Sequence, residues 1–282
     1  MKYGILNLDV RRDNNLLTSK SLWKRMMQRE CKRMKREEYP YLYETHLHTK
    51  EASACAAASA EEMVQAAKEA GYSGIFITNH NWYGNTCIDR SLRWGEWISR
   101  FSEAYKKAKH YGDKIGLDVF FGYESGYHGT EFLIYGVDAN WLMTHPEIKD
   151  ATVEEQYLLI HQAGGLVIHA HPYREASYIS EIRLFPEAVD GIEGANATHA
   201  CHLSKHHYNP EYDVRARNYA GKYDFPITGG SDVHNTLMLG GGVAFRTKLT
   251  SEQDYVERIK AGTDYVVTDG DYWYDSYGKG IV

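Results

Sequence analysis

The chain has 282 residues, a length that suits either one α/β barrel or two smaller domains. Its hydrophobic content of 43% and charged content of 25% are those of an ordinary globular protein, and its net charge of −6 argues against a long nucleic acid as the main partner. No apolar run approaches the length of a membrane span, and the four cysteines lack the spacing of a disulfide scaffold or a CxxC site, so we expect a reducing, cytoplasmic setting.

The first forty residues differ from the rest and are interpreted as a basic amphipathic extension, residues 1–40. Residues 20–38 carry eight Lys and Arg against three Glu. Apolar side chains recur there at helical spacing, at Leu22, Trp23, Met26, Met27, Cys31 and Met34. Such a helix could lie on a membrane or an acidic partner. We favour docking of its apolar stripe on the protein's own domain, because a stripe at this spacing usually faces the core.

From residue 41 onward, short apolar runs typical of strands alternate with amphipathic stretches typical of helices. Strands are expected over residues 41–46, 74–79, 118–124, 131–138, 166–171, 188–194, 225–232 and 264–269. Helices are expected over residues 59–71, 93–112, 152–164, 211–222 and 251–262. Capping boxes mark two of their starts, Ser59 with Glu62 and Thr152 with Glu155, and glycines mark most of their ends.

This alternation predicts an α/β fold with a mostly parallel sheet. About seven strand–helix units in one chain favour a closed, TIM-like barrel over an open sheet. Because no Gly/Pro/Ser-rich linker or internal repeat interrupts the pattern, residues 41–282 are expected to form a single domain that ends in a tyrosine-rich tail.

Histidines and carboxylates cluster where the predicted strands end. His46 and His48 are two residues apart, so they project to the same face of a strand. The same spacing recurs at Asp232 and His234 and at His169 and His171, while His80 and Glu124 end two further strands. In a parallel barrel all these ends open onto one mouth, which is where active sites of such barrels lie.

Five such clusters are hard to explain by packing alone, although a single His-x-His pair often has no function. Imidazole together with carboxylate suits Zn, Mn or Fe, whereas oxygen ligands alone would suit Mg or Ca. The candidates exceed what one tetrahedral ion can use, so at least two metal ions are implied. No Walker motif, GxGxxG turn or GxSxG elbow points to a nucleotide cofactor or a serine nucleophile.

The motifs THLHT, ITNH, GYES, HAHPYR, IEGAN and GGSDVH occur in the order and rough spacing of the PHP (polymerase and histidinol phosphatase) family, which residues 41–270 resemble. The resemblance implies a distorted seven-stranded β/α barrel, (β/α)7, that holds two or three divalent transition metals (Mn, Fe or Zn) and hydrolyses phosphate esters. It makes these residues the metal ligands, with Glu124 bridging two ions: His46, His48, His80, Glu124, His171, Asp232 and His234.

The chain departs from the family pattern at three places. Asn79 stands where the family usually has an aspartate before His80. Only Cys55 could replace a ligand that commonly follows the first His-x-His pair, and Glu131 takes the place of a histidine after the bridging glutamate. Cys55 and Glu131 are therefore two further candidate ligands. His169 matches no family ligand and is expected to pack or to support another ligand.

Three residues are candidates for contact with substrate. Arg174 could clamp a phosphate with two hydrogen bonds, or pair with a surface glutamate. The segment 197–207 should overhang the mouth, and there the resemblance favours His199 or His202 as a proton donor over a solvated loop without function.

These features together predict a metal-dependent phosphoesterase that hydrolyses a small phosphomonoester, such as histidinol phosphate, by a metal-bound hydroxide. Two alternatives stay open. One is a phosphodiesterase or nuclease that acts on nucleotides or short oligonucleotides, or an amide hydrolase on the same metals. The other is a PHP-like metal-binding module without catalysis.

Overall fold

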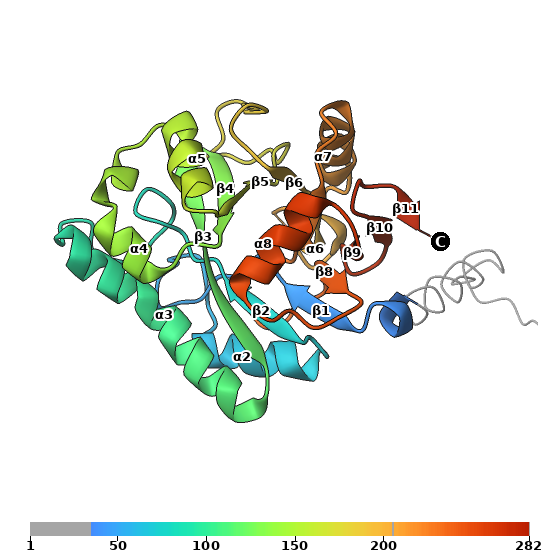
Figure 1. Cartoon of the computed structure of the whole chain (residues 1–282), viewed down its shortest axis with the longest axis horizontal. Coiled ribbons are helices and arrows are strands. Elements are labelled where there is room, and N and C mark those ends of the chain that lie inside the picture. Colours follow the sequence, from blue (N-terminus) through green and yellow to red (C-terminus); the bar gives the residue numbers. More distant parts are fainter. Residues whose placement is uncertain (1–34, 205, 282) are drawn as a thin grey trace, which may run out of the picture.

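The computed structural model describes residues 35–281 except residue 205, and its elements follow the predicted alternation up to residue 230 (Figure 1). In chain order they are β1 (Tyr41–Glu44), α2 (Ala60–Glu69), β2 (Gly74–Ile77), α3 (Trp94–Ile115), β3 (Asp118–Tyr127), β4 (Thr130–Tyr135), α4 (Ala139–Thr144), the 3-10 turn η1 (Pro146–Lys149), α5 (Val153–Gln162), β5 (Leu166–Ala170), β6 (Gly191–Asn196), α6 (Ala197–Ala200), α7 (Glu211–Lys222), β7 (Ile227–Gly230), β8 (Gly242–Phe245), α8 (Glu252–Ala261), β9 (Tyr265–Thr268), β10 (Trp273–Asp275) and β11 (Gly280–Ile281).

All these strands belong to one mixed sheet with the order β11-β10-β9-β8-β1-β2-β3-β4-β5-β6-β7. Two groups are parallel, β1-β2-β3 and β5-β6-β7, whereas β3-β4-β5 and β1-β8-β9-β10-β11 are antiparallel. The expectation of a mostly parallel sheet is therefore wrong. The alternation of strands and helices breaks at the turn of His128 and Gly129, both at positive φ, which joins β3 directly to β4 without a helix.

The sheet curls so that the segments that follow its strands β1 and β7 meet. Leu47, just past β1, forms an isolated parallel bridge with Val233, just past β7. The His48 amide donates to the Val233 carbonyl at 3.0 Å, and the Val233 amide donates to the His46 carbonyl at 3.3 Å. This contact brings two candidate ligand pairs, which lie far apart in sequence, to the same place.

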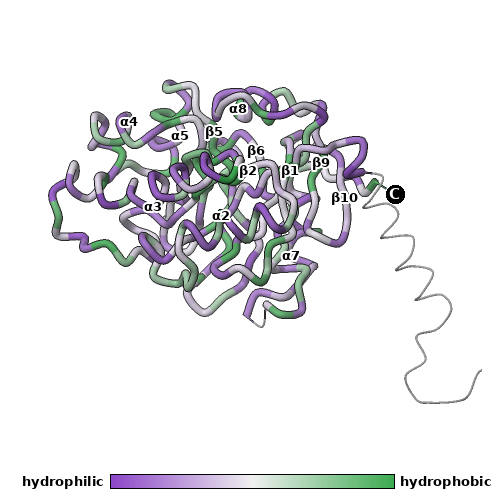
Figure 2. Tube along the Cα trace, turned by 90° about the horizontal axis from the view of Figure 1, so that it is seen from below, coloured by the Kyte–Doolittle hydropathy of each residue, from purple (hydrophilic) through white to green (hydrophobic). Residues whose placement is uncertain are grey.

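Both faces of the parallel part of the sheet are covered, which explains why strand β2 is a continuous apolar run. Ile75 and Ile77 pack on one face in a cluster with residues of α2 and α3. Phe76 points to the opposite face, where its ring lies 5.2 Å from that of Tyr135 and 4.6 Å from that of Tyr255. Figure 2 shows hydrophobic residues along β2 and β5 in the middle of the molecule and hydrophilic residues on the outer turns of the helices.

Local signals placed most helix ends correctly. The capping boxes at Ser59 and Thr152 are formed, Ser251 caps α8, and Gly262 ends α8 in the left-handed conformation. The predicted end of the long helix at Gly112 is wrong, because α3 continues to Ile115 and ends at Gly116 with φ 71°. Gly112 instead lies where the helix packs against residues 117 and 119.

The predictions for the two ends of the chain have different outcomes. Most of the predicted basic extension lies outside the described residues, so its role stays a prediction. Its last turn is helical, and there Arg36 donates to the Gly71 carbonyl at 2.6 Å and Glu38 pairs with Arg246 at 2.6 Å. The tyrosine-rich tail packs on its own sheet, since the Ile227 amide donates to the Ser276 carbonyl at 2.7 Å. Among the described residues, no helix has the length and apolar character needed to cross a membrane.

Candidate metal centre

Eight histidine and carboxylate side chains from six segments converge at one end of the sheet. They comprise all seven predicted ligands and the further candidate Glu131. They follow β1 (His46 and His48), β2 (His80), β5 (His171) and β7 (Asp232 and His234), or lie within β3 (Glu124) and β4 (Glu131). The sequence-based expectation that these side chains share one mouth agrees with this arrangement.

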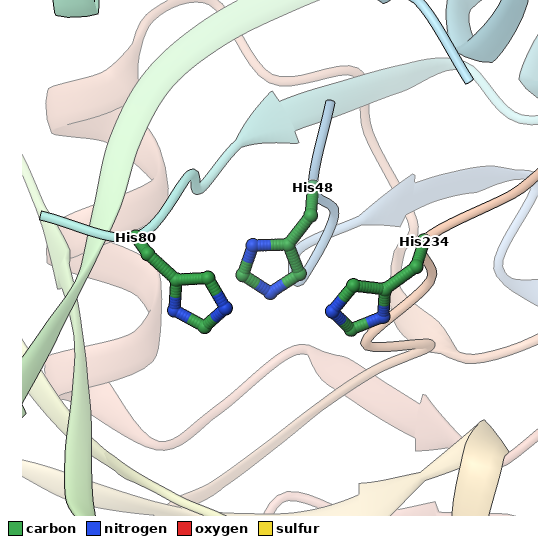
Figure 3. Close-up of side chains that lie close together, drawn as sticks. All are labelled: His48, His80 and His234. Atoms are coloured by element: carbon green, nitrogen blue, oxygen red, sulfur yellow. The ribbon is translucent and has the colours of Figure 1, made fainter. Parts of the chain in front are cut away.

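These side chains form four overlapping groups of three. In each group the potential ligand atoms all lie within 4.8 Å of one another. The groups are His48, His80 and His234; His46, His48 and Glu124; His46, His171 and Asp232; and His80, Glu124 and Glu131. Figure 3 shows the first group, with three imidazole rings from three separate segments around one space. Because the groups share members, the arrangement suits neighbouring ions better than independent ones.

Local backbone structure orients the side chains of His46 and His48. Leu47 is fully buried in the cluster beneath helices α2 and α3, so its neighbours His46 and His48 both face the other way. Their ring centroids lie 5.2 Å apart. The bridge between Leu47 and Val233 then sets this pair beside Asp232, whose Oδ1 lies 3.3 Å from His48 Nε2 and 3.5 Å from His46 Nε2.

Two candidate ligands are held in unusual backbone conformations. His171 has φ 28° and Asp232 has φ 50°, although neither is a glycine. The His171 amide donates to Glu193 Oε2 at 3.0 Å, which helps to fix that turn. Non-glycine residues at positive φ are rare and gather at functional sites.

In three histidines one ring nitrogen is engaged by a neighbour, which leaves the other nitrogen for a metal. Nδ1 of His46 lies 2.8 Å from Glu193 Oε1, and Nδ1 of His48 lies 3.3 Å from the Ser53 hydroxyl. Nδ1 of His234 lies 3.0 Å from the Asp232 carbonyl oxygen. A carboxylate or carbonyl that accepts from Nδ1–H fixes the tautomer with a free Nε2, which is the usual support of a metal-bound histidine.

Four buried polar atoms in the cluster lack a hydrogen bond of acceptable geometry: His46 Nε2, His48 Nε2, His80 Nδ1 and Glu124 Oε2. They crowd together nonetheless, since His80 Nδ1 lies 2.7 Å from Glu124 Oε2. Buried polar groups in folded proteins are nearly always hydrogen-bonded, so a concentration of exceptions at one place needs a cause. The donor set of imidazole and carboxylate fits divalent transition metals.

The charges of the cluster also favour a bound cation. Burial pushes the pKa of Glu124 up, but the nearby His46 and His80 outweigh it and hold that pKa well below its usual range. In turn, burial lowers the pKa of His46, yet the Asp232, Glu193 and Glu124 carboxylates raise it well above its usual value. Carboxylates that draw protons onto buried imidazoles would equally stabilise metal ions.

Arg174 links the cluster to a chain of buried polar groups. Its side chain is buried and donates to Asp232 Oδ2 through Nη2 and to His199 Nε2 at 3.1 Å through Nε. Nδ1 of His199 lies 2.6 Å from Asp213 Oδ1. Since arginine only donates, His199 Nε2 carries no hydrogen and its Nδ1–H donates to Asp213.

A cleft of about 1130 Å³ opens above the cluster. Its inner wall includes Glu124, Glu131, His171, Asp232 and Arg174, and its outer wall carries aromatic and charged side chains, among them Tyr83, Tyr127, Tyr178, Arg183 and Phe185. Burial, together with the Glu124 carboxylate, raises the pKa of Glu131 to about 8.

The two predicted proton donors do not lie in this cleft. His199 is fully buried with both ring nitrogens engaged, so its position suits support of Arg174 better than proton donation. His202 is exposed and lies with its ring 4.2 Å from that of Tyr208. His207, from the same segment, does line the cleft. Periodicity could not show which histidine of an irregular loop faces the site.

The departures from the family pattern have separate structural reasons. Asn79 is turned away from the ligands: its Oδ1 accepts from the Thr49 amide at 2.7 Å and from the Ser53 hydroxyl at 2.8 Å. Cys55 is exposed and lines the cleft. Burial raises its pKa, but hydrogen bonds with His234 and His80 outweigh this and bring the pKa to about 7.

His169 is a packing residue. It is buried, and its ring stacks on that of Phe132 with 4.9 Å between centroids. Burial lowers its pKa to about 3, so the ring is neutral. This agrees with one of its two expected roles.

Two buried residues that support the ligands, Glu193 and Ser53, were not predicted. Glu193 lies in β6, in the IEGAN motif, and bonds to His46 and His171. Its place in a strand among ligand-bearing strands was the signal that could have identified it. Ser53 bonds to both His48 and the His80 amide from an irregular loop, where the sequence offers no such signal.

Comparison with known proteins gives two family matches. Residues 44–224 match the model of the PHP domain, and residues 211–263 match the model of a PHP-associated region. A search of curated proteins found no match.

Among solved structures, the chain is similar to a two-domain protein from Bacteroides vulgatus that is described as containing a PHP-like metal-dependent phosphoesterase. The TM-score is 0.57 at 14% identity, over 80% of this chain and 64% of that one, so the chain spans slightly less than two thirds of that protein's length. At this identity the likeness concerns the fold.

Two weaker likenesses were also found. One is to a candidate metal-dependent phosphoesterase from Bifidobacterium adolescentis, with TM-score 0.49 and 16% identity over 79% of this chain and 96% of that one. The other is to an amidohydrolase from Chromobacterium violaceum, with TM-score 0.45 and 13% identity over 68% of this chain and 87% of that one.

Proposed function

Because the chain belongs to the PHP domain family, we propose that it is a metal-dependent phosphoesterase that hydrolyses a small phosphomonoester. The observation that carries this proposal is a set of four buried ligand atoms without hydrogen bonds, on His46, His48, His80 and Glu124, which belong to overlapping groups of potential ligands. A bound cation accounts for both their burial and their chemical type.

We propose that the cluster holds two divalent ions, or three, drawn from Mn, Fe and Zn. The ligands would be His46, His48, His80, Glu124, His171, Asp232 and His234, with Glu131 as a further one. Among the three carboxylates of the cluster, only Glu124 belongs to two of the four groups, which supports a bridging role. Cys55 stays a candidate ligand beside His80 and His234. The protein surrounding these ions would be a distorted barrel of seven strands, β1 to β7.

Bound divalent metals would lower the pKa of water and stabilise charge on phosphoryl oxygens. The residues of the chain provide the rest. Oδ1 of Asp232 faces the cluster, and Oδ2 of the same carboxylate accepts from Arg174. A phosphoryl group at the cluster would therefore also lie near the guanidinium. Arg174 lines the cleft and is held by His199, and we propose that it orients the phosphoryl group.

The lining of the cleft favours a small substrate over a long polyanion. Arg183 and Arg174 are positive side chains of its lining, but Asp150, Glu154 and Glu131 line the same cleft. The described residues of the cleft thus do not form a continuous basic groove for a nucleic-acid strand. A cleft of about 1130 Å³ can still accept a nucleotide, so hydrolysis of a short phosphodiester is the second candidate function.

The test is phosphatase activity of the purified chain with Mn, Fe or Zn. Wild type should hydrolyse a phosphomonoester, and the double variant His46→Ala with Asp232→Ala should lose on the order of 10³-fold in kcat/KM, because metal stabilisation of the transition state is worth several kcal/mol. His161→Gln, at an exposed helix position, is the matched control. Equal turnover by wild type and the double variant would refute the proposal.

The same assay separates the alternatives. Faster turnover of a dinucleotide than of a monoester would favour phosphodiester hydrolysis. Less than one equivalent of bound transition metal and no turnover would favour a metal-binding module without catalysis.

A further inference from the structure

Tyr178 lies at the mouth of the cleft on the irregular segment between β5 and β6. Its side chain lines the cleft together with Arg174, Glu131 and Asp232. The residue is 53% exposed, whereas Arg174 beneath it is 3% exposed. Burial raises the pKa of Tyr178, and the Arg174 guanidinium, which lies near the Tyr178 hydroxyl, lowers that pKa against the rise. Tyr178 therefore combines an exposed position at the mouth with a place beside the buried Arg174.

Among the described residues, three tyrosines line the cleft, and their hydroxyls differ in one respect. The Tyr83 hydroxyl donates to Asp150 Oδ1 at 2.9 Å. The Tyr127 hydroxyl donates to the Ala151 carbonyl at 3.1 Å. Tyr178 lies instead beside a guanidinium, which can only donate, so this neighbour can use only the Tyr178 oxygen and the hydroxyl hydrogen is left for another acceptor.

The cleft geometry indicates which acceptor that hydrogen would meet. Most of the candidate metal ligands are buried, and those that line the cleft form its floor, while Tyr178 is exposed at its mouth. A phosphoryl group on the floor must direct its ester oxygen and organic part outward. In an in-line displacement the departing oxygen leaves on the side opposite the attacking water.

We propose that Tyr178 is a catalytic residue that donates a hydrogen bond to the ester oxygen as it leaves; this inference rests on the proposed phosphoesterase function. The water oxygen bonds to phosphorus while the ester P–O bond breaks, and the ester oxygen keeps the bonding electron pair. Tyr178 stabilises that charge and keeps its own proton. The departing oxygen takes up one proton from solvent, in place of the proton that the attacking water loses.

The neighbouring structure supports a fixed position for Tyr178. Gly129, at the tip of the β3–β4 turn, packs so closely on this segment that a Cβ there would lie 3.1 Å from the Tyr178 carbonyl oxygen and 3.1 Å from Ile179 Cα. The Ile179 amide also donates to the Ala176 carbonyl at 2.9 Å. Burial raises the pKa of Tyr178, so the hydroxyl stays protonated at neutral pH.

The proposal is tested with two aryl phosphates whose leaving groups differ. Phenyl phosphate has a poor leaving group that needs a hydrogen-bond donor, whereas p-nitrophenyl phosphate has a good one that does not. Tyr178→Phe should lower kcat for phenyl phosphate by about 10²-fold, as removal of one oxyanion donor does, and change kcat for p-nitrophenyl phosphate far less. Tyr83→Phe and Tyr127→Phe line the same cleft and should leave the ratio between the two substrates unchanged.

Each outcome decides the matter. A loss for both substrates by the same factor would mean that Tyr178 only supports the cleft, and no loss would mean that it has no role; either result overturns the inference but not the phosphoesterase proposal. If wild type hydrolyses neither substrate with Mn, Fe or Zn, the phosphoesterase proposal fails, and the role of Tyr178 with it.

A crystal structure with vanadate gives a readout that does not depend on turnover. The Tyr178 hydroxyl should lie within about 3.2 Å of the apical vanadate oxygen on the mouth side. A hydroxyl turned out to solvent in that complex would also overturn the inference. The metal content of Tyr178→Phe should equal that of wild type, which checks that the variant is folded and loaded.

Discussion

Single residues beneath the ligands decide how the ligands point. Glu193 is buried, and its two oxygens lie 2.8 Å from His46 Nδ1 and 3.0 Å from the His171 amide, which donates to it. One buried carboxylate therefore orients two candidate ligands from different strands. Residues of this kind tune metal affinity without touching the metal.

For Glu193→Gln we expect metal affinity to fall about 10- to 100-fold, because an amide is a poorer acceptor for His46 Nδ1–H and disturbs its tautomer. Glu187→Gln, an exposed position just before the same strand, should leave the affinity unchanged. Titration of the metal-free proteins with Mn or Zn measures the difference. Equal affinities for the two variants would show that Glu193 does not support the site.

Asn79 provides a second test at this scale. Its side chain accepts from the Thr49 amide and Ser53 and donates to Thr49 Oγ1 at 3.0 Å, so it holds the loop after His48 and does not face the ligands. Asn79→Asp should therefore not add a metal ion, and it should lower the free energy of unfolding by about 1–3 kcal/mol, because the carboxylate cannot donate. An extra equivalent of metal in the variant, measured by elemental analysis, would contradict this orientation.

The sequence predicted the convergence of the ligands much better than their supports. His46 with His48 and Asp232 with His234 are recognisable because a two-residue spacing in a strand needs no knowledge of the fold. Glu193 acts on a histidine 147 residues away, a relation that no local pattern contains. In the segment 197–207, His207 lines the cleft and His202 does not, and an irregular loop has no period that would indicate which side chain faces inward.

At the scale of elements, local caps fixed the helix starts and packing fixed one helix end. Ser59, Thr152 and Ser251 cap helices as predicted. Gly112 resembles a helix end in the sequence, but it is a contact residue inside α3. A Cβ at this position would lie 2.6 Å from Val119 Cγ2 and 2.7 Å from the carbonyl oxygen of residue 117.

Gly112→Ala should lower the free energy of unfolding by about 1–3 kcal/mol, because the added methyl group overpacks the contact between α3 and β3. Gly95→Ala in the same helix meets no atom within 4 Å and should instead raise it by about 0.4–1 kcal/mol. Denaturant unfolding of both variants measures the two values. Stabilisation by both substitutions would contradict the close contact of Gly112 with residues 117 and 119.

The β3–β4 hairpin is the element that sequence reasoning handled least well. Both strands were predicted, but the sequence did not indicate that the turn between them makes β4 antiparallel to β3. His128 and Gly129 both adopt positive φ, as a two-residue turn requires, yet histidine gives little hint of it. The reversal places Glu131 in β4, directly across the sheet from Gly126, and so brings it to the ligand cluster.

At the scale of the whole molecule, the curl of the sheet creates the site. The bridge between Leu47 and Val233 unites the segments after β1 and β7, and the ligands from β2 to β5 complete the rim. Three features of the sequence, namely alternation, spacing and resemblance, predicted this convergence. The added strands β8 to β11, which extend the sheet beyond β1, were only partly predicted, because short antiparallel strands at an edge carry weak signals.

Metal binding should stabilise the whole chain, because the ligands come from distant segments and converge only in the folded state. At a metal concentration of about 100 times Kd, the free energy of unfolding should rise by about 2.7 kcal/mol, which corresponds to a rise of about 5–10 °C in Tm. The rise should disappear in the double variant His46→Ala with Asp232→Ala. Thermal unfolding with and without Mn checks this, and equal shifts in both proteins would show binding elsewhere.

The central claim is that eight side chains from six segments hold metal ions together. Crystals grown with Mn and measured for its anomalous scattering test this most directly. We predict at least two anomalous peaks among His46, His48, His80, Glu124, Glu131, His171, Asp232 and His234, with ligand distances of about 2.0–2.3 Å. Manganese peaks only at other places, with this cluster empty, would contradict the account.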